Sequence, residues 1–362
     1  MNAYQKLLSP LDTTIFTFDN RIVMAPMNRR RAEHGVPSPS SIIYYQQRAD
    51  AGLIITDNTA IAPNGIGYLN TPGIYTDEQK TAWAKIASAV HAKGGKIFMQ
   101  LVHGGRIGHQ LNNDDGSALV APSAVPAQEV VKVKDGRHLP VSKPEALSSK
   151  GVQDLITKHI EAAKSAVNAG FDGVEIHGAH GYLVEQFLHP HTNQRTDEYG
   201  GSVENRSRFL LEIVEGVIKA IGANRTGIRL SPYLKISDLL PYEEELATHE
   251  YLTKELDKLG ILYIHLSNRV VNGSPVIPDS YIRSVRNNFQ NLLILAGGYT
   301  PATAEAALKA GLADMVAFGT PYIANPDLVD RIRNGHPLSS GKAELYYDGG
   351  DAGYIDYPRY GE

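Results

Sequence analysis

Two histidines and a tyrosine follow one short apolar segment of the chain: His177, His180 and Tyr182. Glycine and alanine separate them, which allows the backbone to approach a flat or bulky ligand closely. Two imidazoles can hold an oxygen that gains negative charge, and a phenol can deliver a proton, so the three side chains suit reduction of a polarised double bond. Two other interpretations stay open here: a histidine near a strand end is often structural, and His-x-x-His can be half of a metal site.

Composition narrows the class of partner. Of the 362 residues, 42% are hydrophobic and 20% are charged, as in globular proteins. A net charge of -4 gives no general electrostatic case for binding nucleic acid or an anionic membrane, so we expect a small-molecule partner. The chain has no cysteine, which excludes disulfides, thiolate-ligated zinc, iron–sulfur clusters and a cysteine nucleophile.

The N-terminus shows no basic region followed by an apolar run, and no stretch approaches 18 uninterrupted apolar residues. We therefore expect a cytoplasmic protein with no membrane partner. Composition leaves its oligomeric state open between a monomer and a homodimer.

Apolar strand-like segments alternate with amphipathic helical segments along most of the chain. The expected strands are 21–26, 53–57, 96–101, 173–176, 227–230, 261–266, 292–296 and 315–318. The expected helices are 40–51 ended by Gly52, 77–93 capped by Asp77, 152–169, 204–221, 243–259, 278–288, 301–310 and one from Pro326. Eight such units without a second composition regime predict one closed (β/α)₈ TIM barrel, with residues 1–362 as a single domain.

Two segments lie outside the repeat. The polar residues before the first strand are expected to close the bottom of the barrel. Residues from about 106 to 150 are polar and dotted with proline, and an alternating run at 129–133 indicates a hairpin, so we interpret them as an excursion from the barrel.

The carboxyl ends of the strands, where barrel enzymes place their active sites, carry further polar residues. They are Asn28, Asn58, Gln100, His103, Arg229, Asn268, and the turns Gly297-Gly298 and Gly319-Thr320. The glycine turns precede helices expected to begin near Pro301 and Asn325, so their amides could bind a phosphate. The three adjacent arginines at 29–31 are expected to form a solvated loop rather than a phosphate clamp.

Several runs together resemble the old yellow enzyme family of FMN-dependent ene reductases, and its bacterial branch with pentaerythritol tetranitrate reductase and N-ethylmaleimide reductase. The runs are RIVMAPM at 21–27, QLVHGGR at 100–106, QFLHP at 186–190, NQRTDEYGGSVENR at 193–206 and YIANPDL at 322–328. The resemblance covers nearly the whole chain.

The resemblance implies non-covalent FMN across the barrel mouth and NAD(P)H as the reductant. It places the backbone of Pro26 and Met27 beside the ring, Gln100 on the pyrimidine edge, and Arg229 near N1 and the C2 carbonyl, where a cation favours the anionic reduced flavin. It further implies that His177 and His180 bind a carbonyl or nitro oxygen, that Tyr182 is the proton donor, and that substrate contacts come from two more tyrosines, Tyr68 and Tyr347.

Three positions depart from the pattern of that family. Asn28 stands where threonine is common, and its amide could still donate to the flavin C4 carbonyl. Asn58 replaces a usual alanine and brings a polar group near the ring. Thr320, followed by Pro321, replaces an arginine that usually binds the FMN phosphate, which implies that this chain holds FMN less tightly.

The leading interpretation is thus an NAD(P)H-dependent FMN oxidoreductase that reduces activated alkenes, with nitro compounds as further substrates. One alternative keeps the flavin and changes the net reaction to isomerisation or dehydrogenation. Another is a flavin-poor binding protein. A metal enzyme built on His177 and His180 would need a carboxylate pattern around them that the sequence lacks, so no metal is expected.

Overall fold

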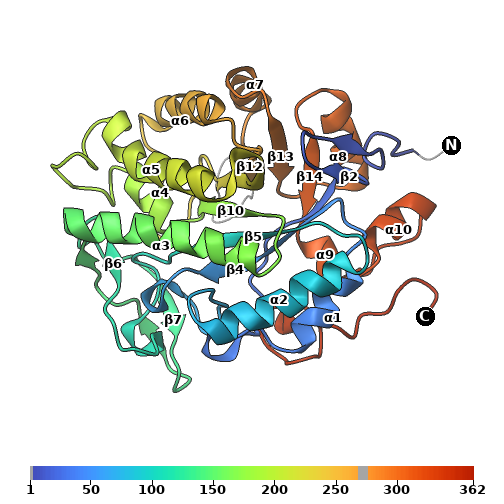
Figure 1. The fold of residues 1–362 in the computed structure, drawn as a ribbon, viewed down its shortest axis with the longest axis horizontal. Coiled ribbons are helices and arrows are strands. Elements are labelled where there is room, and N and C mark those ends of the chain that lie inside the picture. Colours follow the sequence, from blue (N-terminus) through green and yellow to red (C-terminus); the bar gives the residue numbers. More distant parts are fainter. Residues whose placement is uncertain (1–2, 268–275) are drawn as a thin grey trace.

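The computed structural model of the chain, described for residues 3–267 and 276–362, contains eight parallel strands that close into a barrel (Figure 1). In barrel order from the first strand they are β3 (Ile22–Met24), β4 (Leu53–Ala60), β5 (Ile97–Val102), β10 (Gly173–Gly178), β11 (Thr226–Leu230), β12 (Tyr263–Ser267), β13 (Leu292–Ala296) and β14 (Met315–Phe318). Strand β14 pairs in parallel with β3, which completes the ring. The predicted TIM barrel is confirmed.

Helices surround the barrel and bury one apolar face each against it. They are α1 (Ser40–Gln47), α2 (Asp77–His91), α3 (Ser149–Asn168), α4 (Leu183–Leu188), α5 (Val203–Ile221), α6 (Glu245–Leu259), α7 (Asp279–Asn288), α8 (Pro301–Lys309), α9 (Thr320–Ala324) and α10 (Leu328–Asn334). On α3, for example, Val152, Leu155, Ile156 and Ala163 are buried at helical spacing. Pattern alone therefore located α5, α6, α7 and α8 within a few residues, whereas the short helix α4 was not predicted.

Three helices differ from the sequence-based expectation. Helix α1 ends at Gln47, not at residue 51: the Arg48 amide donates to the Tyr45 carbonyl in a tighter turn, and the Arg48 side chain donates to the Tyr44 carbonyl. Helix α2 is capped by Thr76, whose hydroxyl accepts from the Gln79 amide, so Asp77 is the first helical residue. The helix expected from Pro326 is confirmed as α10, which begins at Leu328, but the short helix α9, which begins directly after Gly319, was not predicted.

A short hairpin closes the amino end of the barrel. It consists of β1 (Leu11–Asp12) and β2 (Thr17–Phe18). Phe16 and Phe18 pack with Val23, Phe98 and Tyr263 at the starts of barrel strands, and the Phe16 and Phe98 rings meet edge to face with centroids 5.8 Å apart. The expected cover at the bottom of the fold is confirmed.

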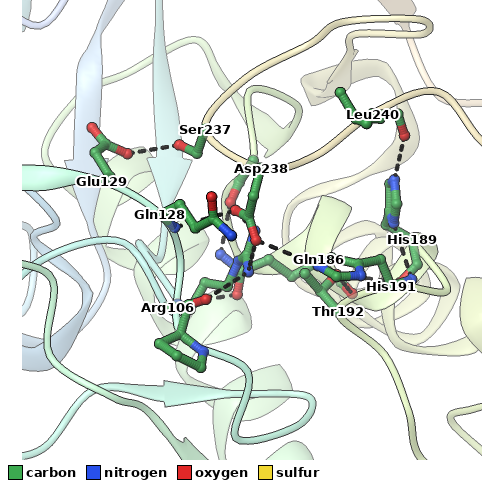
Figure 2. Close-up of polar contacts among 12 residues, drawn as sticks. Arg106, Gln128, Glu129, Gln186, His189, His191, Thr192, Ser237, Asp238 and Leu240 are labelled. Atoms are coloured by element: carbon green, nitrogen blue, oxygen red, sulfur yellow. Dashed lines mark hydrogen bonds and ion pairs between the residues drawn. The ribbon is translucent and has the colours of Figure 1, made fainter.

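The excursion after β5 forms two small two-stranded sheets beside α3 (Figure 1). Strand β6 (Val120–Ala121) pairs with β9 (Glu145–Ala146), and β7 (Val130–Lys132) forms the predicted hairpin with β8 (His138–Pro140). A buried fork from Arg106 to the Asp238 carboxylate ties the start of the excursion to the loop after β11 (Figure 2). The excursion is thereby fixed to the barrel at its mouth.

The expectation of a solvated loop at residues 29–31 is wrong. Arg29 is 1% exposed, and its guanidinium donates to the carbonyls of Tyr346 at 2.9 Å and Gly353 at 2.7 Å. Arg31 donates to five carbonyls from Leu345 to Ala352. Carbonyls from the distant end of the chain satisfy these charges, and a local sequence pattern cannot show that.

Among the residues described, none of the helices combines the length and the apolar character needed to cross a bilayer.

We expect Arg29→Lys to lower the free energy of unfolding by roughly 2–4 kcal/mol, because lysine lacks the planar fork that serves several carbonyls at once from a buried position. Thermal and denaturant melts measure the change. The exposed Arg283 on α7 gives the matched control, Arg283→Lys. Equal midpoints for the two variants would show that the segment around Gly353 is held by other contacts.

Candidate active site

A cavity of about 820 Å³ opens at the carboxyl ends of the barrel strands. Such a volume lies in the range of small-molecule and cofactor sites. It brings together every residue that the sequence analysis assigned to chemistry, cofactor or substrate, namely Pro26, Met27, Asn28, Asn58, Tyr68, Gln100, His177, His180, Tyr182, Arg229, Gly297, Gly298, Gly319, Thr320 and Tyr347. Their shared location is established, and their individual roles are taken up as proposals below.

The His177, His180 and Tyr182 side chains stand together on one side of this cavity. The two imidazole centroids are 5.4 Å apart, and the Tyr182 ring lies 4.9 Å from His177, both pairs edge to face. The buried Nδ1 of His177 has no hydrogen-bond partner in the protein, and Nε2 of His180 lies 2.9 Å from the Ser267 hydroxyl. The group therefore presents polar atoms toward the cavity.

A tight turn after β10 produces this arrangement. His180 and Gly181 both have positive φ, at 60° and 77°, a conformation that glycine tolerates and histidine adopts rarely. The His180 amide donates to Ser231 at 2.9 Å, the Gly181 amide donates to the Glu185 carboxylate, and Gln186 donates to the Gly181 carbonyl at 2.7 Å. These bonds offset the strain and fix the directions of the His180 and Tyr182 side chains.

Burial first, and then the neighbouring Arg229 and His265, hold the pKa of His177 well below its usual value. His177 is therefore a neutral imidazole at physiological pH. A neutral ring donates from one nitrogen and accepts at the other, so it can bind an oxygen without carrying a charge of its own.

A buried carboxylate controls the direction of Gln100. Glu175 is fully buried, accepts from Nε2 of Gln100 at 2.6 Å and lies 2.8 Å from Nδ1 of His265. An ionised carboxylate only accepts, so the amide nitrogen of Gln100 must face it and the amide oxygen is turned elsewhere. Gln100 consequently offers an acceptor to a ligand with an N–H group.

Asn58 is positioned by an irregularity in a strand, and Asn28 lies in the loop after β3. A register shift between Ile55 and Asn58, in the pairing of β4 with β5, turns Asn58 into the cavity, where its buried Oδ1 has no partner. Asn28 donates one amide hydrogen to Thr71 at 2.8 Å, which leaves its second amide hydrogen for a ligand.

Among the residues that the structure describes, those that line the cavity after β13 and β14 are neutral. Gly297, Gly298, Gly319 and Thr320 contribute, together with residues 338–341, and none of these carries a positive charge. Thr320 is exposed and opens α9, with Pro321 in its first turn, where the missing N–H costs nothing. An anion there would depend on backbone amides and hydroxyls.

Sequence reasoning missed several lining residues and included one that the cavity lacks. It missed Ser267 at the end of β12, and it missed Arg30, Ile236, Tyr299 and residues 338–341, which come from loops whose course the local sequence does not determine. His103 is buried beside Asn64 and accepts from the Gly105 amide, so it is structural. Asn268 lies outside the described residues. Within those residues, no group of three or more His, Asp or Glu side chains is placed to hold a metal ion.

The donor set of the cavity fits FMN. The cavity offers an acceptor at Gln100, polar atoms without a protein partner on Asn58 and His177, and an arginine on β11. Glycine-lined loops follow the last two strands. These features suit a flat heterocycle with a phosphate tail. The pattern of the NADH:flavin oxidoreductase / NADH oxidase family matches residues 6–339. The chain belongs to this family.

Individual relatives agree with the family assignment. The chain is 39% identical to a putative 12-oxophytodienoate reductase of Oryza sativa subsp. japonica, over 99% of this chain and 98% of that protein. It is also 39% identical to a probable flavin mononucleotide-dependent alkene reductase of Leishmania infantum, over 97% of both chains.

Solved structures extend the agreement to the fold. Morphinone reductase superposes with a TM-score of 0.94 at 42% identity, over 99% of this chain and 97% of that one. An old yellow enzyme homologue from Zymomonas mobilis gives 0.93 at 39% identity, over 98% and 99%. The expectation of an FMN-dependent oxidoreductase of the old yellow enzyme type is confirmed, whereas the narrower likeness to pentaerythritol tetranitrate reductase stays a prediction.

Burial raises the pKa of Glu185 from 4.5 to about 7, against the opposing effect of its bonds from Gly181 and Ser231. Between these two pH values the folded protein keeps a proton that the unfolded chain releases, so the free energy of unfolding falls as pH rises through this window. Glu185→Gln should reduce the loss of unfolding free energy between pH 4.5 and 8 by at most about 3 kcal/mol, as measured by denaturant melts. The exposed Glu215 provides the control, Glu215→Gln, and the same slope in both variants would contradict the assignment.

Thr320→Arg should tighten FMN roughly 10-fold to 100-fold, because it adds a planar cation to a neutral phosphate end. Riboflavin, which lacks the phosphate, should gain little. Fluorescence titration of folded apoprotein with both flavins measures the difference. Unchanged FMN affinity would mean that another group already neutralises the phosphate or that Pro321 directs the loop away from it.

Proposed function

We propose that the protein is an NAD(P)H-dependent FMN oxidoreductase that reduces activated C=C bonds of α,β-unsaturated carbonyl or nitro compounds. The observation that carries this proposal is that two imidazoles and one phenol lie together beside a cavity that fits a flavin. FMN, when bound, supplies the hydride from its N5 position. The remaining steps belong to side chains of this chain.

His177 and His180 bind the oxygen of the substrate. Hydrogen bonds from two imidazoles stabilise the negative charge that grows on that oxygen during reduction, and they strengthen as the charge develops. The turn around Gly181 holds both rings before the substrate arrives, so little reorganisation is needed.

Tyr182 donates the proton that completes net reduction. Its ring packs against His177, which places the phenol within the same group of side chains as the oxygen-binding pair. A phenol ordinarily has a pKa near 10 and remains a proton source at neutral pH. This donor argues against a net isomerase, which would return the proton to the same substrate skeleton.

Four groups hold the cofactor in this proposal. The Gln100 oxygen accepts from the pyrimidine N–H, Arg229 stands by the N1 edge, Pro26 and Met27 lie beside the ring, and amides near Gly298 and Gly319 receive the phosphate. Tyr68 and Tyr347 line the substrate side. Residues 1–362 act as one domain, and a cytoplasmic location and a monomeric or homodimeric state remain expectations.

The direct test is an anaerobic experiment on the purified yellow protein. NAD(P)H should bleach the flavin absorbance between roughly 370 and 460 nm, and 2-cyclohexenone should restore it. Bleaching without restoration would favour a dehydrogenase or another oxidant. Colourless protein that does not take up added FMN would favour the flavin-poor binding protein.

Replacing Tyr182 by Phe should slow reoxidation by 2-cyclohexenone roughly 100-fold or more, because the general acid is lost. Reoxidation by a nitro compound, whose protons can come from water, should be slowed less. Stopped-flow absorbance measures both rates in one preparation. Equal slowing with the two oxidants would assign Tyr182 to binding or packing instead.

A further inference from the structure

Arg30 stands in the wall of the cavity between two aromatic rings. Its guanidinium carbon lies 4.5 Å from the centroid of Tyr68 and 4.7 Å from that of Tyr347, and the side chain is half-buried. Aromatic faces attract cations and hold them without neutralising them. The two rings therefore fix a positive charge at a defined point of the substrate side.

The backbone of Arg30 adopts a conformation that costs free energy. Its φ is 51°, and its amide donates to Oδ1 of Asn28 at 2.9 Å. An arginine with positive φ is uncommon, and such strain persists where the surroundings impose it, often at ligand sites. Here the strain directs a cation into the cavity.

Among the residues that the structure describes, Arg30 forms no ion pair with a carboxylate, whereas several other arginines do. They include Arg106, Arg137, Arg195, Arg206, Arg286 and Arg331. The buried Nε of Arg30 has no hydrogen-bond partner. Arg29 and Arg31, in contrast, are saturated by carbonyls of the last part of the chain.

The carboxylate beyond Tyr68 already has its own donors. The Tyr68 hydroxyl donates to one oxygen of Glu129. The Ser237 hydroxyl donates to the other oxygen at 2.8 Å, as Figure 2 shows. These two bonds also hold the Tyr68 ring against Arg30. Glu129 thus orients the wall around the cation instead of pairing with it.

We propose that Arg30 binds a carboxylate of the substrate, so that the site prefers unsaturated carbonyl compounds that carry a carboxylate at a distance from the reacting oxygen. This inference rests on the proposed function. A guanidinium offers a planar fork of N–H donors that matches a carboxylate. Binding would also satisfy a partly buried charge that otherwise lacks an acceptor.

The location of Arg30 indicates that its ligand is a group of the substrate itself. Its partner Tyr68 packs against the same small apolar cluster as Tyr182, formed by Ile107, Ala127, Val131 and Val141. The cation and the proposed proton donor therefore belong to one wall of the cavity. A ligand oxygen held by the histidine pair and an anionic group near Tyr68 can belong to a single small molecule.

The test uses holoenzyme and matched phenols, whose binding perturbs the flavin spectrum without turnover. The ligands are 3- and 4-hydroxybenzoate and the corresponding neutral hydroxybenzamides. Wild type should bind the better carboxylate roughly 10-fold to 100-fold more tightly than its amide at low salt. Arg30→Asn should abolish this preference, and asparagine tolerates the positive φ of this position. Arg30→Lys should keep part of the preference. The control is Arg283→Asn at an exposed position of α7, which should leave the preference unchanged.

Three outcomes would overturn the proposal. The first is that wild type shows no preference for the carboxylates, and the second is that Arg30→Asn keeps the wild-type preference. The third is that Arg30→Asn keeps the preference but binds NADPH more weakly, which would assign the cation to a cofactor phosphate. Reoxidation of the reduced wild-type flavin by 2-cyclohexenone is measured in parallel. Its failure would contradict the proposed function, whereas its success with no carboxylate preference would contradict the role of Arg30 alone.

Discussion

The register of the parallel strands determines where the polar side chains on the strands of the site stand. Gln100 pairs with both Asn58 and Glu175, and Arg229 pairs with His177 and His265. In a strand, alternate residues share a face, so Glu175 and His177 both point into the barrel at successive levels. A slip of one residue in β10 would exchange these polar groups for Val174 and Ile176.

Polar groups placed inside a barrel need partners, and the partners give the site its direction. Glu175 orients the Gln100 amide, and the fully buried His265 completes the same chain of bonds. At the mouth, Ser231 and Gln186 hold the strained turn that carries the histidine pair. The chemistry therefore depends on side chains beneath and beside the cavity, which fix the geometry before a ligand binds.

Distant segments of the chain supply the wall opposite the strands. The Arg106 fork to Asp238 and the Ser237 bond to Glu129 join the excursion to the loop after β11 (Figure 2). Arg29 anchors the last part of the chain, which carries Tyr347 to the cavity. These long-range contacts therefore position loops that line the cavity as well as stabilising the fold.

The sequence by itself determined the barrel, most of its helices and a large part of the residues that line the site. Strand and helix periodicities are local, and the carboxyl ends of parallel strands meet at one edge, so His177, Gln100 and Arg229 could be grouped without coordinates. Only the tertiary structure decided that Arg29 is buried, that His103 is structural and that Arg30 lies between two tyrosines. The carbonyls that bury Arg29 and the Tyr347 ring beside Arg30 lie more than 300 residues along the chain, and the partners of His103 and the Tyr68 ring come from other loops. No local pattern encodes which of several adjacent arginines will meet such partners.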